Sequence, residues 1–518
     1  MTADTQLDTL ESKGLIRIAT LRPELEYLFR HWLVQDAAYG SLLKQERRAL
    51  HGQVGDALEA LYPERRAELA PVLGMHFEQA GETEKAIDYH LAGAQHALRQ
   101  NAIHEAYGGF DRAAALIEQQ AADPESMTVS PEELRRRRRR FVETELGRAD
   151  AGYSFRAPEE SFDALERIVD AAEELGDPEL IGRVHILIAL GRLQNGQAVS
   201  SPPVKRSLDR LTGLAETSGD PSLGAVPMAL IGLSQVFSGP VREGVELLAD
   251  ALPKIRSHQD SIGAAFARGG LAIGYALLGE FDKADAAAAE ASEIASDGDL
   301  IAQLDAIIAE SFVKSVRGDL DAAIPLAEQC VQRAEETGAS ACMMISSWIL
   351  GDAFHRQRRF TEARDVLQRG TEISLVVDRK VWRPTLEAWL GSSAASLGAD
   401  GGNWDEALQI SRSIGNRVGE AWILGKRAEA AIARGGGIDA ARPDAEASIA
   451  LLDELELRPY LARTLRAWGE ALRGAGLAEA GGAALRRSLA LFDEMGLAPE
   501  AAAVRASLAV GGMKIAFD

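Results

Sequence analysis

A small residue recurs about every forty positions along most of this sequence, and that spacing constrains the fold more than any other feature. A second small residue, a large residue and usually a Gly precede the recurring residue, as Ala272, Tyr275 and Gly279 precede Ala284. Helices pack closely where small residues let their backbones approach, and Gly ends a helix because it tolerates the left-handed conformation. The pattern therefore predicts helix-turn-helix units stacked into an α-solenoid. The recurring small residues of the second helices are Gly244, Ala284, Ala323, Ala363, Ala407 and Ala440, in steps of 40, 39, 40, 44 and 33.

Two short segments mark the joints between such units. Residues 175–179 read "LGDPE" and residues 218–222 read "SGDPS", each with a Gly stop, an Asp N-cap and a Pro at the first helical position. Residues 200–207, "SSPPVKRS", instead predict a lengthened loop.

The charge balance and the cysteine count limit the classes of function. The chain has 56 basic and 78 acidic residues, a net charge of −22, which argues against a general nucleic-acid or anionic-membrane surface. Cys330 and Cys342 both fall in apolar helical settings, so we expect a reducing compartment. No apolar run approaches the roughly 18 residues of a membrane span, and residues 1–14 lack the features of a signal peptide. A soluble, cytoplasmic protein is expected.

The repeat offsets resemble those of the tetratricopeptide repeat (TPR) in a longer form, over about residues 70–510. The resemblance implies an all-α, TPR-like α-solenoid, a right-handed superhelix of helix-turn-helix repeats. We assign residues 63–518, about ten repeats, to this solenoid.

Residues 1–62 differ from the repeats. They predict a short helix, two strands at residues 15–19 and 27–29 that form a hairpin around Pro23, and then further helices. Together with Phe29-Arg30-His31, Gln35 and Ala38-Tyr39, this stretch resembles the end of the winged-helix module that precedes the repeats in signal-transducing multidomain (STAND) ATPases. The resemblance is nearest to bacterial proteins with an adenylate/guanylate cyclase domain, an AAA-type ATPase and C-terminal TPRs. The cyclase and ATPase are absent here, so neither activity is implied.

No motif in the sequence predicts catalysis, a metal or a cofactor. "GEAWILGKRAEA" (residues 419–430) has one residue too many for a phosphate loop, lies in a helical segment, and carries Arg427 where Ser or Thr must bind magnesium. The histidines are scattered without metal-ligand spacing, and no nucleophile elbow occurs. We therefore expect a non-enzymatic protein without cofactors.

The inner surface of a TPR-like solenoid is the expected binding surface, since TPR partners usually lie against the first helix of each repeat. The repeat offsets place six candidate residues on this concave side, where aromatic and Arg side chains are good anchors for a peptide or protein. An alternative for the two tryptophans among them is simple packing between helices. Trp404 is expected to be structural. The candidates are Phe266, Trp348, Asp352, His355, Arg356 and Trp422.

Six consecutive arginines, residues 135–140, raise the question of nucleic-acid binding. Successive helical residues are about 100° apart, so the six cannot share one face. Acidic residues flank the run, and no aromatic residues interleave with it. A solvated face or intramolecular contacts are favoured over a docking patch for an acidic partner or nucleic acid.

Two functions are compatible with the sequence. The first is recognition of a protein or peptide on the concave groove, as the sensor or scaffold module of a bacterial signalling regulator. The partner could be an ATPase or output domain in cis or trans, and a small effector is an alternative ligand. The second is transcription regulation through the N-terminal winged helix, although Lys13, Arg17, Arg22 and Arg30 are few basic residues for reading DNA. We do not expect nucleic-acid or membrane partners.

Overall fold

The computed structural model describes residues 3–20, 26–122, 129–255, 261–296 and 300–510. In these ranges it contains 25 α-helices and two short strands, which confirms the all-α, TPR-like solenoid fold. The elements of the first third are α1 (Ala3–Ser12), β1 (Ile16–Thr20), β2 (Glu26–Phe29), α2 (Trp32–Ser41), α3 (Lys44–Leu61), η1 (Pro63–Arg65), α4 (Arg66–Ala80), α5 (Thr83–Arg99), α6 (Ile103–Ala121), α7 (Pro131–Gly152) and α8 (Pro158–Leu175).

The remaining elements continue the alternation of paired helices. They are α9 (Pro178–Gln194), α10 (Pro202–Ser218), α11 (Pro221–Ser238), α12 (Val241–Ala251), η3 (Leu252–Lys254), α13 (Ser261–Leu278), α14 (Phe281–Ser296), α15 (Leu300–Arg317), α16 (Leu320–Thr337), α17 (Ser340–Arg356), α18 (Phe360–Val377), α19 (Arg383–Ser396), α20 (Trp404–Ser413), α21 (Arg417–Ala433), α22 (Gly437–Glu454), α23 (Arg458–Gly474), α24 (Ala478–Glu494) and α25 (Ala498–Val510).

The chain divides into two compact units. The first comprises residues 1–96 and 108–128 and includes the expected hairpin, in which β1 pairs antiparallel with β2 and Ile18 lies opposite Tyr27. The expected turn at Pro23 lies outside the described residues. The assignment of residues 1–62 to a winged-helix remnant stays a prediction.

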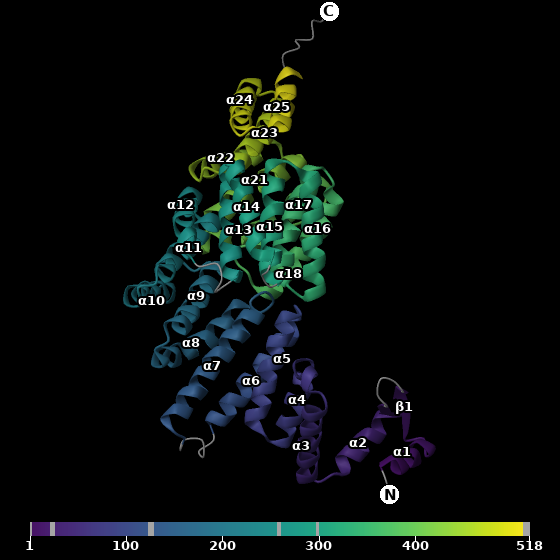
Figure 1. Cartoon of the computed structure of the whole chain (residues 1–518). Coiled ribbons are helices and arrows are strands. Elements are labelled where there is room, and N and C mark those ends of the chain that lie inside the picture. The colour runs from purple at the N-terminus through teal and green to yellow at the C-terminus, as the bar shows by residue number, and fades with distance from the viewer. Residues whose placement is uncertain (1–2, 21–25, 123–128, 256–260, 297–299, 511–518) are drawn as a thin grey trace, which may run out of the picture. The chain divides into compact units, whose positions relative to one another are not determined.

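The second unit, residues 97–107 and 129–518, is built from stacked antiparallel helix pairs, seen best in α13 to α18 (Figure 1). Small residues hold these pairs together as predicted. A Cβ atom on Gly244 of α12 would lie 2.7 Å from the carbonyl oxygen of Gly232 on α11, so only Gly permits this approach. The prediction was wrong by one residue in α22, where Ala440 is exposed and Ala441 is the buried packing residue.

The joints follow the predicted turn chemistry in two places and depart from it in one. Gly176 and Gly219 adopt left-handed conformations, and the Asp177 and Asp220 side chains cap the helices that follow. The lengthened loop expected at residues 200–207 is wrong, because α10 already begins at Pro202. Proline lacks a backbone N–H, but the first helical turn needs none.

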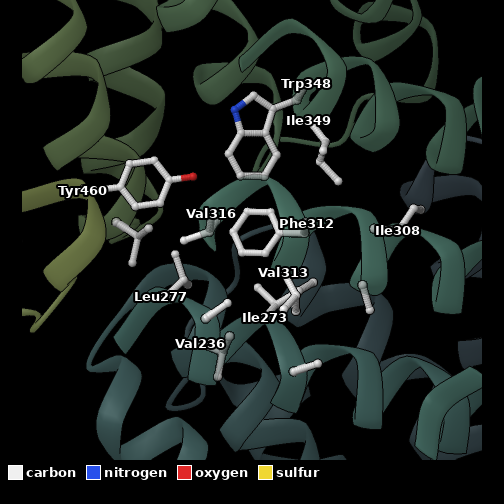
Figure 2. Packing of buried hydrophobic residues seen from close by; sticks show 14 of the residues in the cluster. Val236, Ile273, Leu277, Ile308, Phe312, Val313, Val316, Trp348, Ile349 and Tyr460 are labelled. Carbon is white, nitrogen blue, oxygen red and sulfur yellow. The ribbon is translucent and has the colours of Figure 1, made fainter. Parts of the chain in front are cut away.

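The inner side of the second unit is filled by its own aromatic residues. The Trp348 ring centroid lies 5.5 Å from Phe312, 5.7 Å from Trp389 and 5.2 Å from Trp422, and Trp422 lies 5.1 Å from Tyr460. Figure 2 shows Trp348 beside Phe312, with the Tyr460 hydroxyl pointing inward toward them. We call these five residues, together with Trp382, the aromatic core.

Distant repeats also contact one another directly across this unit. The Ala341 backbone N–H donates to the Ser154 carbonyl at 2.8 Å, and an Arg242–Glu456 ion pair of 2.8 Å joins α12 to the residues before α23. Such contacts place side chains together that lie more than a hundred residues apart in the sequence.

The arginine run of α7 makes intramolecular contacts, one of the two arrangements that the sequence favours over a docking patch. Arg138 pairs with Glu174 at 2.7 Å, Arg139 pairs with Asp177 at 2.6 Å, and Arg135 donates to the Leu175 carbonyl at 2.9 Å. The run therefore ties α7 to the C-terminal end of α8.

Helix α11 is the one helix in the described residues that has the length and apolar composition of a membrane span, which the sequence analysis did not anticipate. Its Ala229, Leu233 and Val236 are buried in the same hydrophobic cluster as the aromatic core. Of this apolar window, 39% is buried inside the structure.

Candidate functional site

A cavity of about 510 Å³ opens at one end of the aromatic core. We call it the inner cavity. Its walls come from the first helices of four repeats, α17, α19, α21 and α23, from the terminal helix α25, and from α22 and the turn after α15. Trp389, Trp422 and Tyr460 border it on the side of the aromatic core.

The structure brings four of the six predicted site residues to this cavity. Asp352, His355 and Arg356 on α17 and Trp422 on α21 all line it. Phe266 lies elsewhere, beside a separate void of about 50 Å³. Whether any of these residues binds a ligand stays a prediction.

Trp348 does not reach the inner cavity. Its side chain is 3% exposed and belongs to the aromatic core, which favours packing between helices, the alternative considered for this residue. Trp422 is 8% exposed and has both roles, since it packs on Trp348 and also borders the cavity. Trp404 begins α20 and packs against the hydrophobic core, as expected for a structural residue.

Arg356 is a largely buried cation of the site, with 17% of its side chain exposed. Its guanidinium donates to the Ser315 carbonyl at the end of α15, lies 3.8 Å from Asp352, and lies 3.4 Å from Glu500. Asp352 also accepts the indole N–H of Trp389 at 2.7 Å. Burial, aided by the charge of Arg463, lowers the pKa of Arg356 to about 10, so the group stays protonated at neutral pH.

A second polar group lies on α21. Lys426 donates to Glu429 at 2.8 Å, and the Nε2 atom of His355 lies 3.7 Å from the same carboxylate. Burial opposes ionisation of Glu429, but Lys426 and His355 together hold the pKa of its carboxyl down to about 2. Burial and the Lys426 charge lower the pKa of His355, so its imidazole is neutral at neutral pH.

Two N–H donors at the cavity are left without acceptors. Within the described part of the chain, neither the indole N–H of Trp422 nor the Nε–H of Arg463 has a hydrogen-bond partner. Burial and the nearby Asp352 raise the pKa of the Tyr460 phenol, which keeps its hydroxyl protonated. The unpartnered nitrogens of Trp422 and Arg463 are themselves buried, as is the indole nitrogen of Trp348 outside the cavity, which likewise has no partner among the described residues.

Several cavity residues are not among the six candidates from the sequence, although the spacing along the helices marks some of them. Trp348, Asp352 and His355 follow one another at i, i+4 and i+7, and Trp422, Lys426 and Glu429 repeat this spacing on α21. That repetition would have added Lys426 and Glu429 to the candidates. Arg463 and Glu500 carry no such signal, because contacts between distant repeats bring them to α15.

No metal site emerges from the same geometry. Among the residues that the structure describes, no group of three or more His, Cys, Asp or Glu could hold a metal ion. Lys426, the lysine of the rejected phosphate-loop segment, lies inside helix α21, where the backbone N–H groups are already used.

No protein-family profile matches this sequence, and no curated protein is significantly similar to it. Among solved structures, that of a Rap protein complexed with competence and sporulation factor is 12% identical with a TM-score of 0.50, covering 68% of this chain and 98% of that one. A STAND protein with a tetratricopeptide repeat sensor from Pyrococcus horikoshii is 13% identical with a TM-score of 0.36, over 93% of this chain and 61% of that one. The APC/C hetero-tetramer Cut9–Hcn1 is 13% identical with a TM-score of 0.46, over 91% and 92%. The likeness to the Rap protein is one of fold.

Proposed function

We propose that this protein is a non-catalytic recognition module of a bacterial signalling regulator and that it binds its ligand in the inner cavity. The ligand is a peptide, a segment of a partner protein or a small effector of comparable size. The observation that supports this proposal is the cavity itself, about 510 Å³ with aromatic walls and several charged side chains. Ligand sites commonly combine apolar walls with a few well-placed polar groups in a space of about 300–1,000 Å³.

Two further observations support this proposal. The aromatic core fills the middle of the solenoid, and the inner cavity beside it offers room for a ligand of this size. The Rap protein, which shares the fold, has been solved with a bound factor. A cytoplasmic sensor whose occupancy is relayed to an output domain fits these features.

DNA binding by residues 1–62 is the alternative, and a specific measurement separates the two. We expect the protein to pass through a DNA column without retention even at low salt, because a net charge of −22 opposes phosphate contacts. Retention that falls steeply with added salt would support the alternative.

The proposal is tested by filling the cavity. Ala467 is half-buried and lines the cavity, so Ala467→Trp occupies the space without removing a polar contact. Ala502→Trp on the exposed side of α25 is the matched control. The protein is incubated with a mixed library of short peptides and metabolites, and bound species are recovered by ultrafiltration and identified by mass spectrometry.

We expect the same compounds to be retained by the wild type and the Ala502→Trp protein and to be lost from the Ala467→Trp protein. Circular dichroism confirms that both variants fold. Equal retention by all three proteins would place recognition outside the inner cavity and refute the proposal.

A further inference from the structure

Glu500, on the terminal helix α25, places its carboxylate against Arg356 and Arg463 in the inner cavity. We call this place between the two arginines the anion position. Its Oε1 atom accepts from Arg463 at 3.0 Å and from Arg356 at 3.4 Å. Charge-assisted N–H···O bonds are usually about 2.7–2.9 Å long, and arginine–carboxylate pairs often use both oxygens. Here one oxygen is shared between two cations at longer distances, so Glu500 is an imperfect partner.

The two arginines are held in place without Glu500. Arg463 donates to the Val316 carbonyl at 2.6 Å, and Arg356 donates to the neighbouring Ser315 carbonyl. These carbonyls belong to the last turn of α15, where the helix dipole attracts cations. Both arginine side chains are less than one-fifth exposed, so they stay fixed and partly desolvated even if Glu500 moves away.

The charges of the cavity balance only when Glu500 is counted. The cations Arg356, Lys426, Arg463 and Arg466 face the acids Asp352, Glu429, Glu470 and Glu500. Removing the Glu500 carboxylate leaves one positive charge in a partly enclosed site, and an uncompensated, partly buried charge is unfavourable. One incoming negative group restores the balance.

The surroundings of the two arginines specify what that group carries. The guanidinium groups of Arg356 and Arg463 that contact Glu500 need another acceptor in its place, while Asp352 and Glu429 are already engaged by Trp389 and Lys426. The walls of the cavity near Trp422 and Tyr460 are aromatic. A ligand with carboxylate oxygens on an apolar body meets both needs.

We propose, on the premise that the inner cavity is the recognition site, that its ligand carries a carboxylate that displaces Glu500 from Arg356 and Arg463 and thereby loosens α25. Glu500 is an internal occupant that keeps the site closed when no ligand is present. The carboxylate has two sources, a small organic acid or the C-terminus of a peptide, and both present the same group. Release of α25 gives ligand binding a structural consequence at the end of the solenoid.

The test uses matched acids and amides on the full chain. N-acetyl-L-phenylalanine represents a small acid, and N-acetylglycylglycyl-L-phenylalanine represents a peptide terminus. Each is compared with its C-terminal amide by calorimetry and by tryptophan fluorescence. Preference for the shorter or the longer acid tells which source the site fits.

Glu500→Gln keeps the size of the side chain and removes its charge. We expect it to raise the affinity for the acids about ten-fold, because the side chain at position 500 then competes less strongly for the two arginines. The affinity for the amides should stay low. Glu494→Gln is the matched control, since Glu494 pairs with Arg458 outside the cavity. Arg463→Lys keeps the charge but loses the planar guanidinium, which can donate two hydrogen bonds to one carboxylate. The affinity for the acids is therefore expected to fall.

Hydrogen exchange gives a second readout that does not depend on affinity. We expect the amides of α25 to exchange faster when an acid is bound to the wild type, and to exchange faster in Glu500→Gln without any ligand. Unchanged exchange in both conditions contradicts the displacement of α25.

The outcomes separate the two proposals. If acid and amide bind equally and Ala467→Trp abolishes both, the inner cavity is the recognition site but the carboxylate has no role. If Glu500→Gln leaves the affinity for the acids unchanged, Glu500 is not a competitor. If neither acid binds the Glu500→Gln protein, in which the anion position is vacated, the inference is overturned whatever the library experiment shows.

Discussion

Replacing Trp348 by Ala tests whether the inner side of the solenoid is packed or open at its middle. The side chain is 3% exposed, and the rings of Phe312, Trp389 and Trp422 surround it. The substitution therefore removes most of the surface that a tryptophan buries, about 150–250 Å². A ring that served as an exposed anchor in an open groove would lose far less.

The expected cost follows from that area. At about 25 cal/mol per Å², the lost burial amounts to roughly 4–6 kcal/mol. The indole N–H has no partner among the described residues, and an unsatisfied buried donor costs about 1–3 kcal/mol. Trp348 borders a void of about 20 Å³, enough for one water, which puts this cost at the low end of that range. Because Ala removes the donor too, we expect a net destabilisation of about 3–5 kcal/mol, which is the range for core Trp→Ala changes.

Urea unfolding followed by far-ultraviolet circular dichroism measures the free energy of unfolding of both proteins. Val376→Ala on α18 is the control, because this side chain is 75% exposed and its loss is expected to cost less than about 0.5 kcal/mol. A Trp348→Ala cost below about 1 kcal/mol would show that the ring is not packed and that the groove is open there.

Three further predictions concern charge and burial. The pKa of Glu429 is held at about 2 against an ordinary 4.5, so its ionised form stabilises the fold at neutral pH, and this contribution is lost as the pH falls from 4.5 toward 2. Glu429→Gln should therefore be destabilising at neutral pH, and its difference from the wild type should vanish in acid-unfolding curves near pH 2. Burial raises the pKa of the Cys330 thiol to about 12, so iodoacetamide should alkylate it at mildly alkaline pH only after urea is added, as mass spectrometry can check. Arg139→Gln removes a partly exposed pair with Asp177 and should lower the free energy of unfolding by about 0.5–1 kcal/mol, less in high salt, and an unchanged value would make the pair neutral.

Much of the fold could be predicted from the sequence because packing residues repeat with the architecture. Close helix crossings require small residues, so Gly232 and Gly244 mark their own contact. The one-residue error at Ala440 has a local cause. Gly435 and Gly436 precede α22 and Gly437 is its first residue, and such a glycine run leaves the register of the helix undetermined by local chemistry.

The site could be predicted only in part. Some of its residues are placed by their position within one repeat, and others are brought in by contacts between distant repeats. Asp352, His355 and Arg356 follow from the position of α17 within its repeat, and the sequence carries that information. Arg463 and Glu500 meet the end of α15 through contacts between distant repeats. No spacing within one repeat predicts how far the superhelix turns, and that turn decides which residues meet.

The position of the inner cavity follows from the direction of the inner helices. On α17 the residue one turn beyond the core tryptophan is Asp352, and the following turn carries His355 and Arg356. On α21 the same progression runs from Trp422 to Lys426. Each helix therefore packs its aromatic residue in the middle of the solenoid and presents charge toward its C-terminal end, where the helix dipole favours cations such as Arg356, the last residue of α17. A solenoid built this way directs an anionic group to one end of its inner side, the end at which α25 supplies Glu500.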